Sequence, residues 1–122
     1  MPKPDHETTF QQLRSILQRY EPHLVAVNDK PDNYYLDTSH IQPNKKPLFF
    51  GSASIGKQYV SFHLMPVYVW PDLLDGASED LRRRMQGKSC FNFKKPEPEL
   101  LAELAVLTDR GFERYREHGY TR

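Results

Sequence analysis

The chain has 122 residues, the usual length of one domain, and 38% of them are hydrophobic. Its 17 Lys and Arg nearly balance 16 Asp and Glu, so it lacks the basic excess typical of nucleic-acid binding. It also lacks the apolar run of a membrane span or a signal peptide, and its single cysteine, Cys90, has no intrachain disulfide partner. These features predict one cytoplasmic domain over residues 1–122, with no membrane or nucleic-acid partner.

The first predicted element is an amphipathic helix that ends near Tyr20, just before Pro22. Thr8 and Gln11 match a capping box, which would place the helix start at Thr8. Apolar residues at three- and four-residue steps define its buried face, which comprises Phe10, Leu13, Leu17, Tyr20 and Leu24.

Short strands are predicted at residues 24–27 and 34–37, and the turn-forming and charged residues between them indicate a hairpin. Residues 39–47 are polar and carry two prolines, so they predict a loop. Strands at residues 48–55 and 58–65 follow, and their connection of two residues is short enough for antiparallel neighbours.

Alternation divides the strand at residues 58–65, and a last strand at residues 89–94, into a core face and a half-polar face. If both strands belong to one sheet, their polar sets share the face opposite the core. The core set is Val60, Phe62, Leu64, Phe91 and Phe93, and the opposite set is Tyr59, Ser61, His63, Met65, Cys90 and Asn92.

Between these strands, residues 67–70 are bracketed by prolines and predict a crossing segment that lays aromatic area over the sheet. A short helix follows, with Ser78 as its N-cap and Gly87 as its end. The final helix begins near Glu97 and ends at Gly119, and its buried stripe is Leu100, Leu104, Leu107, Gly111 and Tyr115. The fold class is therefore α+β, with an antiparallel sheet of about four to five strands packed with N- and C-terminal helices.

The segment from residue 82 to residue 95 contains basic but no acidic side chains. Residues 87–89 (GKS) match the end of a phosphate-binding loop motif. That motif needs another glycine five residues before Gly87, where this chain has Arg82, so no nucleotide-binding loop is predicted. The basic side chains would either receive an anion or form a solvated face paired with Glu97 and Glu99. They are Arg82, Arg83, Arg84, Lys88, Lys94 and Lys95.

Cys90 and His63 allow two interpretations. As a nucleophile and its base they would need a thiolate, which the nearby lysines would favour. Alternatively Cys90 is a small buried hydrophobe, and His63 is a buried histidine hydrogen-bonded to the backbone or to Tyr68. No CxxC, HxxxH or HExxH spacing accompanies them, so no metal site is predicted.

Residues 60–68 (VSFHLMPVY) and 85–93 (MQGKSCFNF) resemble the YdhG-like family of small bacterial domains. The resemblance extends from about Phe10 to Tyr115. Some members of the wider group are described as frataxin-like iron chaperones, so the resemblance implies helices packed on one antiparallel sheet and offers iron binding as an alternative function.

Frataxin-type proteins hold iron through an acidic first helix and the neighbouring strand edge. In this sequence the first helix region offers only Asp5, Glu7 and Glu21, interrupted by Arg14 and Arg19. The resemblance therefore supports the fold more than iron binding.

These observations predict a non-enzymatic small-ligand binding or carrier domain with an unidentified ligand and no assigned cofactor. Its site would comprise Ser61, His63, Cys90 and Asn92, edged by Tyr68 and Lys88, with Lys88 favouring an anionic ligand. The alternatives are an iron chaperone, a thiol enzyme using Cys90 and His63, and a protein-interaction module that uses residues 67–70. A homodimer is compatible with each of them.

Overall fold

The structure is a computed structural model that describes residues 4–121, and it confirms the predicted α+β class. The strands are β1 (Val25–Lys30), β2 (Asn33–Ile41), β3 (Pro47–Ile55), β4 (Val60–Leu64), β5 (Met85–Gln86) and β6 (Cys90–Phe93). The helices are α1 (Pro4–Gln18), α2 (Met65–Val69), α3 (Glu79–Arg83) and α4 (Pro98–Glu117), with 3-10 turns η1 (Glu21–His23) and η2 (Pro71–Leu74).

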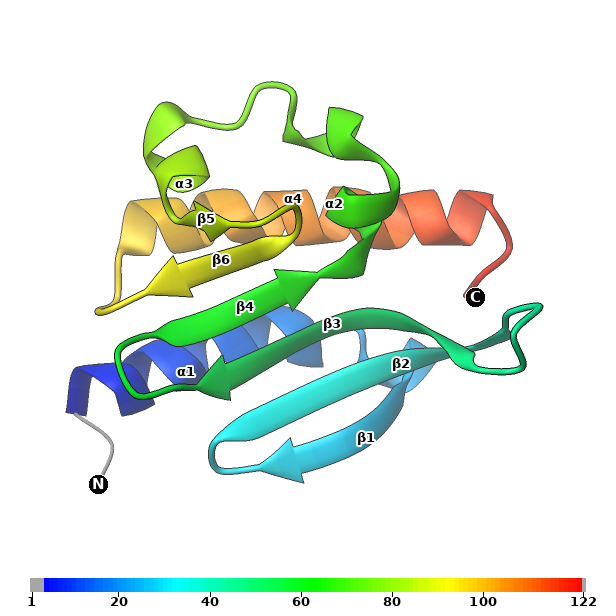
Figure 1. The fold of residues 1–122 in the computed structure, drawn as a ribbon, viewed down its shortest axis with the longest axis horizontal. Helices are drawn as coiled ribbons and strands as arrows, with labels where there is room; N and C mark the ends of the chain where they lie inside the picture. Colours follow the sequence, from blue (N-terminus) through cyan, green and yellow to red (C-terminus); the bar gives the residue numbers. More distant parts are fainter. Residues whose placement is uncertain (1–3, 122) are drawn as a thin grey trace.

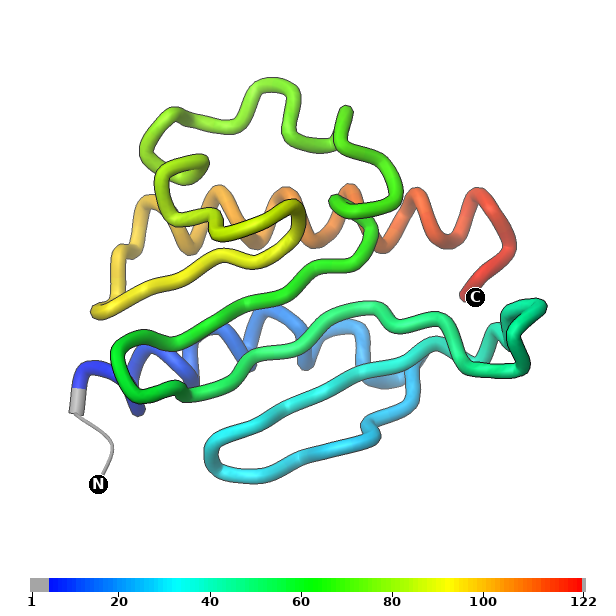
Figure 2. The backbone as a smooth tube through the Cα atoms, in the orientation of Figure 1, coloured from blue at the N-terminus to red at the C-terminus, as the bar shows by residue number. Residues whose placement is uncertain are grey.

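The strands form one antiparallel sheet in the order β1-β2-β3-β4-β6-β5, and the long helices α1 and α4 lie behind it in Figure 1. The backbone trace in Figure 2 shows α2, η2 and α3 along the β5 edge. No helix of the described residues lies over the face turned toward the viewer. We call this face the open face of the sheet.

The core lies between the sheet and the two long helices, and the predicted core side chains are buried except Leu24 and Leu100, which are partly buried at its margin. Aromatic rings fill much of this space: Phe50 on β3 meets Phe112 and Tyr115 of α4 edge-on, with centroids 5.8 and 5.7 Å apart. The predicted core side chains that are buried include Leu13, Leu17, Val60, Phe62, Leu64, Phe91, Phe93, Leu104 and Leu107.

A β-bulge in β3 shifts the alternation of the strand by one residue and so decides which of Phe49 and Phe50 faces the core. Leu36 pairs with Gly51 and Asp37 pairs with Phe49, so Phe50 is the extra residue. Phe50 enters the core, whereas Phe49 packs among side chains of the open face. The Tyr115 hydroxyl of α4 donates a 2.8 Å hydrogen bond to the Phe49 carbonyl and ties the bulge to the helix layer.

Four predicted boundaries are wrong. The loop predicted for residues 39–47 is shorter, because β2 continues to Ile41 and β3 begins at Pro47. Helix α1 begins at Pro4, so Thr8 lies within the helix and does not cap it. Proline and acidic residues are favourable in the first turn of a helix, so this start needs no capping box. The hairpin between β1 and β2 turns over two residues, because the polar residues up to Lys30 continue β1. Helix α3 ends at Arg83, and Gly87, with φ of 81°, instead makes the turn between β5 and β6.

The connection after β4 also differs from the predicted aromatic cover. Residues 65–69 form the short helix α2, so Met65 is not in a strand and Tyr68 remains 54% exposed. The extra strand relative to the predicted sheet is β5, which is too short to give a periodic signal.

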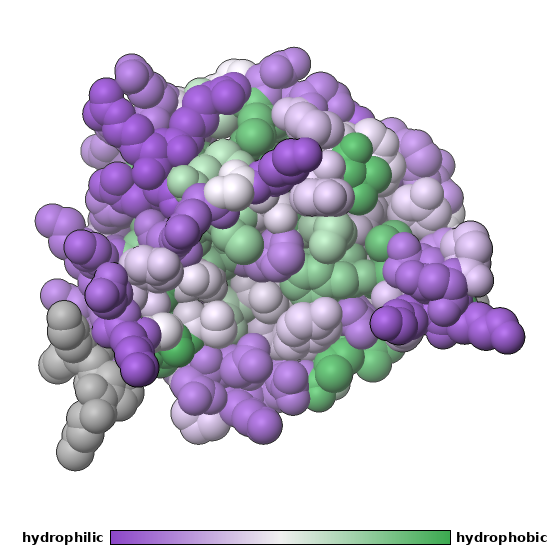
Figure 3. Space-filling view, in the orientation of Figure 1, coloured by the Kyte–Doolittle hydropathy of each residue, from purple (hydrophilic) through white to green (hydrophobic). Residues whose placement is uncertain are grey.

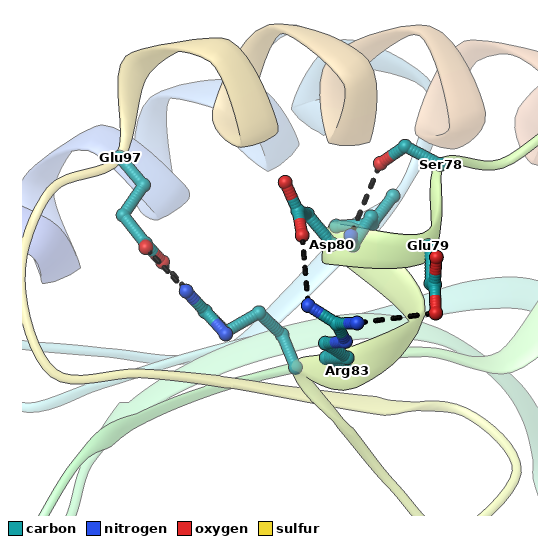
Figure 4. A network of polar contacts seen from close by, with 7 residues as sticks. Ser78, Glu79, Asp80, Arg83 and Glu97 are labelled. Atoms are coloured by element: carbon teal, nitrogen blue, oxygen red, sulfur yellow. Dashed lines mark hydrogen bonds and ion pairs between the residues drawn. The ribbon is translucent and has the colours of Figure 1, made fainter.

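The remaining helix ends agree with the sequence. Ser78 caps α3 by accepting a hydrogen bond from the Leu81 amide at 3.1 Å (Figure 4), and Gly119 follows α4 with φ of 76°. In α4 the first buried leucine is Leu101 rather than Leu100. No helix in the described part of the chain is long and apolar enough to cross a membrane.

Candidate ligand-binding site

The strand register places the predicted polar residues together on the open face. Ser61 is opposite Asn92, and His63 is opposite Cys90. The Leu64 amide donates to the Ser89 carbonyl at 3.0 Å, so the neighbouring pair Leu64–Ser89 is a hydrogen-bonded pair. Hydrogen-bonded and non-hydrogen-bonded pairs alternate along an antiparallel ladder. Ser61–Asn92 and His63–Cys90 are thus non-hydrogen-bonded pairs, in which cross-strand side chains are closest.

A hydrogen-bond network fixes the Asn92 side of this group. Ser61 Oγ donates to Asn92 Oδ1 at 2.8 Å, and Asn92 Nδ2 donates to Gln86 Oε1 at 2.8 Å. The Tyr59 hydroxyl donates to the same Gln86 oxygen at 3.1 Å. These side chains from β4, β5, β6 and the loop before β4 hold one another in place without contribution from the helices.

The His63 side of the group is aromatic. The His63 and Phe49 rings meet edge-on with centroids 4.9 Å apart, and Phe49 stacks on Tyr35 at 4.5 Å. Among the described residues the His63 ring has no hydrogen-bond partner, so the predicted bond to the backbone or Tyr68 is not formed. Burial lowers the pKa of His63 below 6.5, which favours the neutral ring at pH 7.

We expect His63 to titrate with a midpoint below its ordinary 6.5 when its ring resonances are followed by NMR. Since the unfolded chain then takes up the proton first, stability present above about pH 6.5 is lost as the pH falls through the folded pKa. His63→Gln should remove this contribution. A midpoint above 6.5 would contradict the buried environment.

Cys90 is partly buried on β6, and burial raises the pKa of its thiol above 9.0. The predicted lowering by nearby lysines is therefore wrong, because desolvation of the thiolate dominates. The Lys88 ammonium instead lies over the Tyr68 ring, 5.7 Å from its centroid. Lys88 and Tyr68 thus pair with each other beyond the Cys90 end of β6.

Alkylation of Cys90 by iodoacetamide should be slower at pH 7 in the folded protein than in denaturant, and its rate should still rise above about pH 9. The raised pKa leaves less thiolate at neutral pH. A folded-state rate at pH 7 above that of the unfolded chain would instead identify an activated thiol.

The open face includes residues that the sequence interpretation missed. Tyr35 and Asp37 alternate with the buried Tyr34 and Leu36, a period-2 signal that the sequence contains. Burial raises the pKa of the Asp37 carboxyl, which gives this face an acidic group on β2. The others are Phe49, Ser52, Ser54 and Gln86, of which Phe49 depends on the bulge.

The basic segment from residue 82 to residue 95 is neutralised only in part. Arg84 forms a bidentate ion pair with Glu97, with N–O distances of 2.7 and 2.5 Å. Arg83 reaches Glu79 and Asp80 within α3 (Figure 4). The solvated-face interpretation therefore holds for these two arginines, whereas Lys94 and Lys95 form no ion pair with the described residues.

The surface in Figure 3 shows the open face directly: a pale centre with apolar patches, bordered by hydrophilic side chains. Within residues 4–121 no three His, Cys, Asp or Glu side chains converge as a metal site would require. Comparison of the chain with protein-family models, curated proteins and solved structures found no match.

Proposed function

We propose that this chain is a non-enzymatic small-ligand binding or carrier domain whose ligand lies on the open face over Ser61, His63, Cys90 and Asn92. The observation that carries the proposal is the pairing of these residues on adjacent strands, on the face that α1 and α4 leave uncovered. The hydroxyl, imidazole, thiol and amide of these four residues then lie beside the stacked rings of Tyr35 and Phe49. This combination supplies apolar contact area and a few fixed polar groups, as small-molecule sites do.

The chemistry of Cys90 and His63 favours binding over catalysis. A nucleophilic thiolate needs a lowered pKa, whereas burial raises the pKa of Cys90. A protonated His63 could stabilise a Cys90 thiolate, but burial lowers the pKa of His63 and so favours its loss of the proton. Both groups are therefore neutral near pH 7, which disfavours a thiolate–imidazolium pair.

A protein-interaction module is the second candidate, favoured by the exposed side chains of α2. Tyr68 and Val69, consecutive residues of α2, are 54% and 42% exposed. Exposed apolar side chains of this kind suit a protein partner. If this function holds, Tyr68→Ala should abolish complex formation on gel filtration and leave small-ligand binding unchanged.

The ligand proposal is tested by a thermal-shift panel of small neutral and anionic compounds, with ferrous iron included for the chaperone alternative. At about 100 times its Kd, a ligand adds about 2.7 kcal/mol, which for a domain of this length raises Tm by roughly 10 °C. Ser61→Trp should block the site, because Ser61 faces outward where a large ring can be accommodated. Ser39→Trp, at an exposed position near the end of β2, is the matched control.

The proposal predicts compounds that stabilise the wild type and Ser39→Trp but not Ser61→Trp. Equal stabilisation of Ser61→Trp would place the site elsewhere, and a panel without any stabilising compound would refute small-ligand binding. Stabilisation by ferrous iron alone, lost on changing Asp or Glu residues, would favour the iron chaperone.

A further inference from the structure

A pocket of about 430 Å³ opens where β6 leaves the sheet toward α4. Its volume lies within the range of small-molecule sites, about 300–1,000 Å³. Asn92 belongs both to this pocket and to the open face, so the two are continuous. The lining residues are Tyr59, Arg84, Asn92, Lys94, Lys95 and Glu97.

The pocket carries an excess of positive charge. Glu97 neutralises Arg84 through their bidentate pair, in which Glu97 extends from the segment before α4 (Figure 4). The hydrogen bond from Arg84, and then the charges of Arg84 and Lys95, hold the pKa of Glu97 below its ordinary value. With that pair internally balanced, the ammonium groups of Lys94 and Lys95 remain to interact with a ligand.

The opposite wall of the pocket is held rigid. Asn92 and Tyr59 both donate to Gln86 Oε1, and Asn92 also receives the Ser61 hydroxyl. A ligand therefore meets a hydrogen-bonded amide and phenol together with the exposed ammonium groups of Lys94 and Lys95. Fixed neighbours reduce the entropy lost on binding.

We infer that this pocket binds the oxyanion group, phosphate or carboxylate, of a small ligand whose remainder extends past Asn92 onto the open face. The inference rests on the proposed function and adds the chemical class of the ligand. It also moves the anionic end from Lys88, which is occupied by the Tyr68 ring, to Lys94 and Lys95.

The test uses inorganic phosphate and acetate as separate probes, titrated into the ¹⁵N-labelled full chain at low, constant ionic strength. Amide shifts at Asn92, Lys94 and Lys95 should saturate with at least one probe. Removing each lysine charge should weaken binding about fivefold, the effect of about 1 kcal/mol. The Lys94→Gln/Lys95→Gln variant should therefore bind far more weakly, and the matched Lys30→Gln/Lys46→Gln control should bind like the wild type.

Glu97→Gln provides a test in the opposite direction, because it removes a repelling carboxylate and releases Arg84 from its ion pair. Binding of the same probe should become about fivefold tighter or more. The inference is overturned if neither probe shifts these amides, or if the Lys94→Gln/Lys95→Gln variant binds like its control. The proposed function would still hold in that case if a neutral compound of the thermal-shift panel stabilised the wild type but not Ser61→Trp.

Discussion

Replacing Phe62 with alanine is expected to lower the free energy of unfolding by about 3–5 kcal/mol. The Phe62 side chain is fully buried on β4, between the cross-strand neighbours Ala53 and Phe91. Alanine would leave a cavity under the open face that the two packed layers could not fill. Urea denaturation followed by circular dichroism measures the change.

Val106→Ala is the control for this experiment. Val106 lies on α4 but is 62% exposed, so its replacement should change stability by no more than about 0.5 kcal/mol. If Phe62→Ala proved as mild as this control, Phe62 would not face the core. The strand register that places Ser61 and His63 on the open face would then be wrong.

Tyr115→Ala should destabilise the protein by a similar amount, about 3–5 kcal/mol. The Tyr115 ring is fully buried among Phe50, Trp70 and Tyr120, with centroids 5.5–5.7 Å away. Tyr115→Phe keeps the ring and removes only the hydrogen bond to the Phe49 carbonyl, so it should cost about 1–2 kcal/mol. Parallel urea titrations separate the two contributions.

The phenylalanine variant also tests the link between the core and the site. Because Tyr115 anchors the bulge that turns Phe49 outward, Tyr115→Phe should shift the NMR resonances of Phe49 and His63 more than those of Asn92. Unchanged Phe49 and His63 resonances would show that the bulge keeps its shape without the helix layer.

Alternation and helix periodicity were sufficient to predict the core side chains of β4 and β6 and the pairing of polar residues on the open face. Phe62 and Phe91 alternate with His63 and Asn92, so the face assignment followed from the period of two once both strands joined one sheet. The buried stripe of α4 followed similarly from steps of three and four residues.

Other features depend on long-range contacts that local patterns do not encode. The β3 bulge leaves no local mark, since Phe49 and Phe50 are equally apolar and only the pairing with β2 decides which one turns outward. Gly87 could end a helix or make a turn; the early end of α3 and the pairing of β5 with β6 decided for the turn. The ion pair between Arg84 and Glu97 is one of the two arrangements that the sequence left open, and the structure decides for it.

The most direct test of the central claim is chemical-shift mapping with the panel compound that gives the largest thermal shift. We expect the largest changes in the ¹⁵N and ¹³C spectra at Ser61, His63, Cys90 and Asn92, and we expect Ser61→Trp to abolish them. Changes centred on Tyr68 and Val69, with the open-face resonances unmoved, would contradict the account and identify α2 as the contact surface.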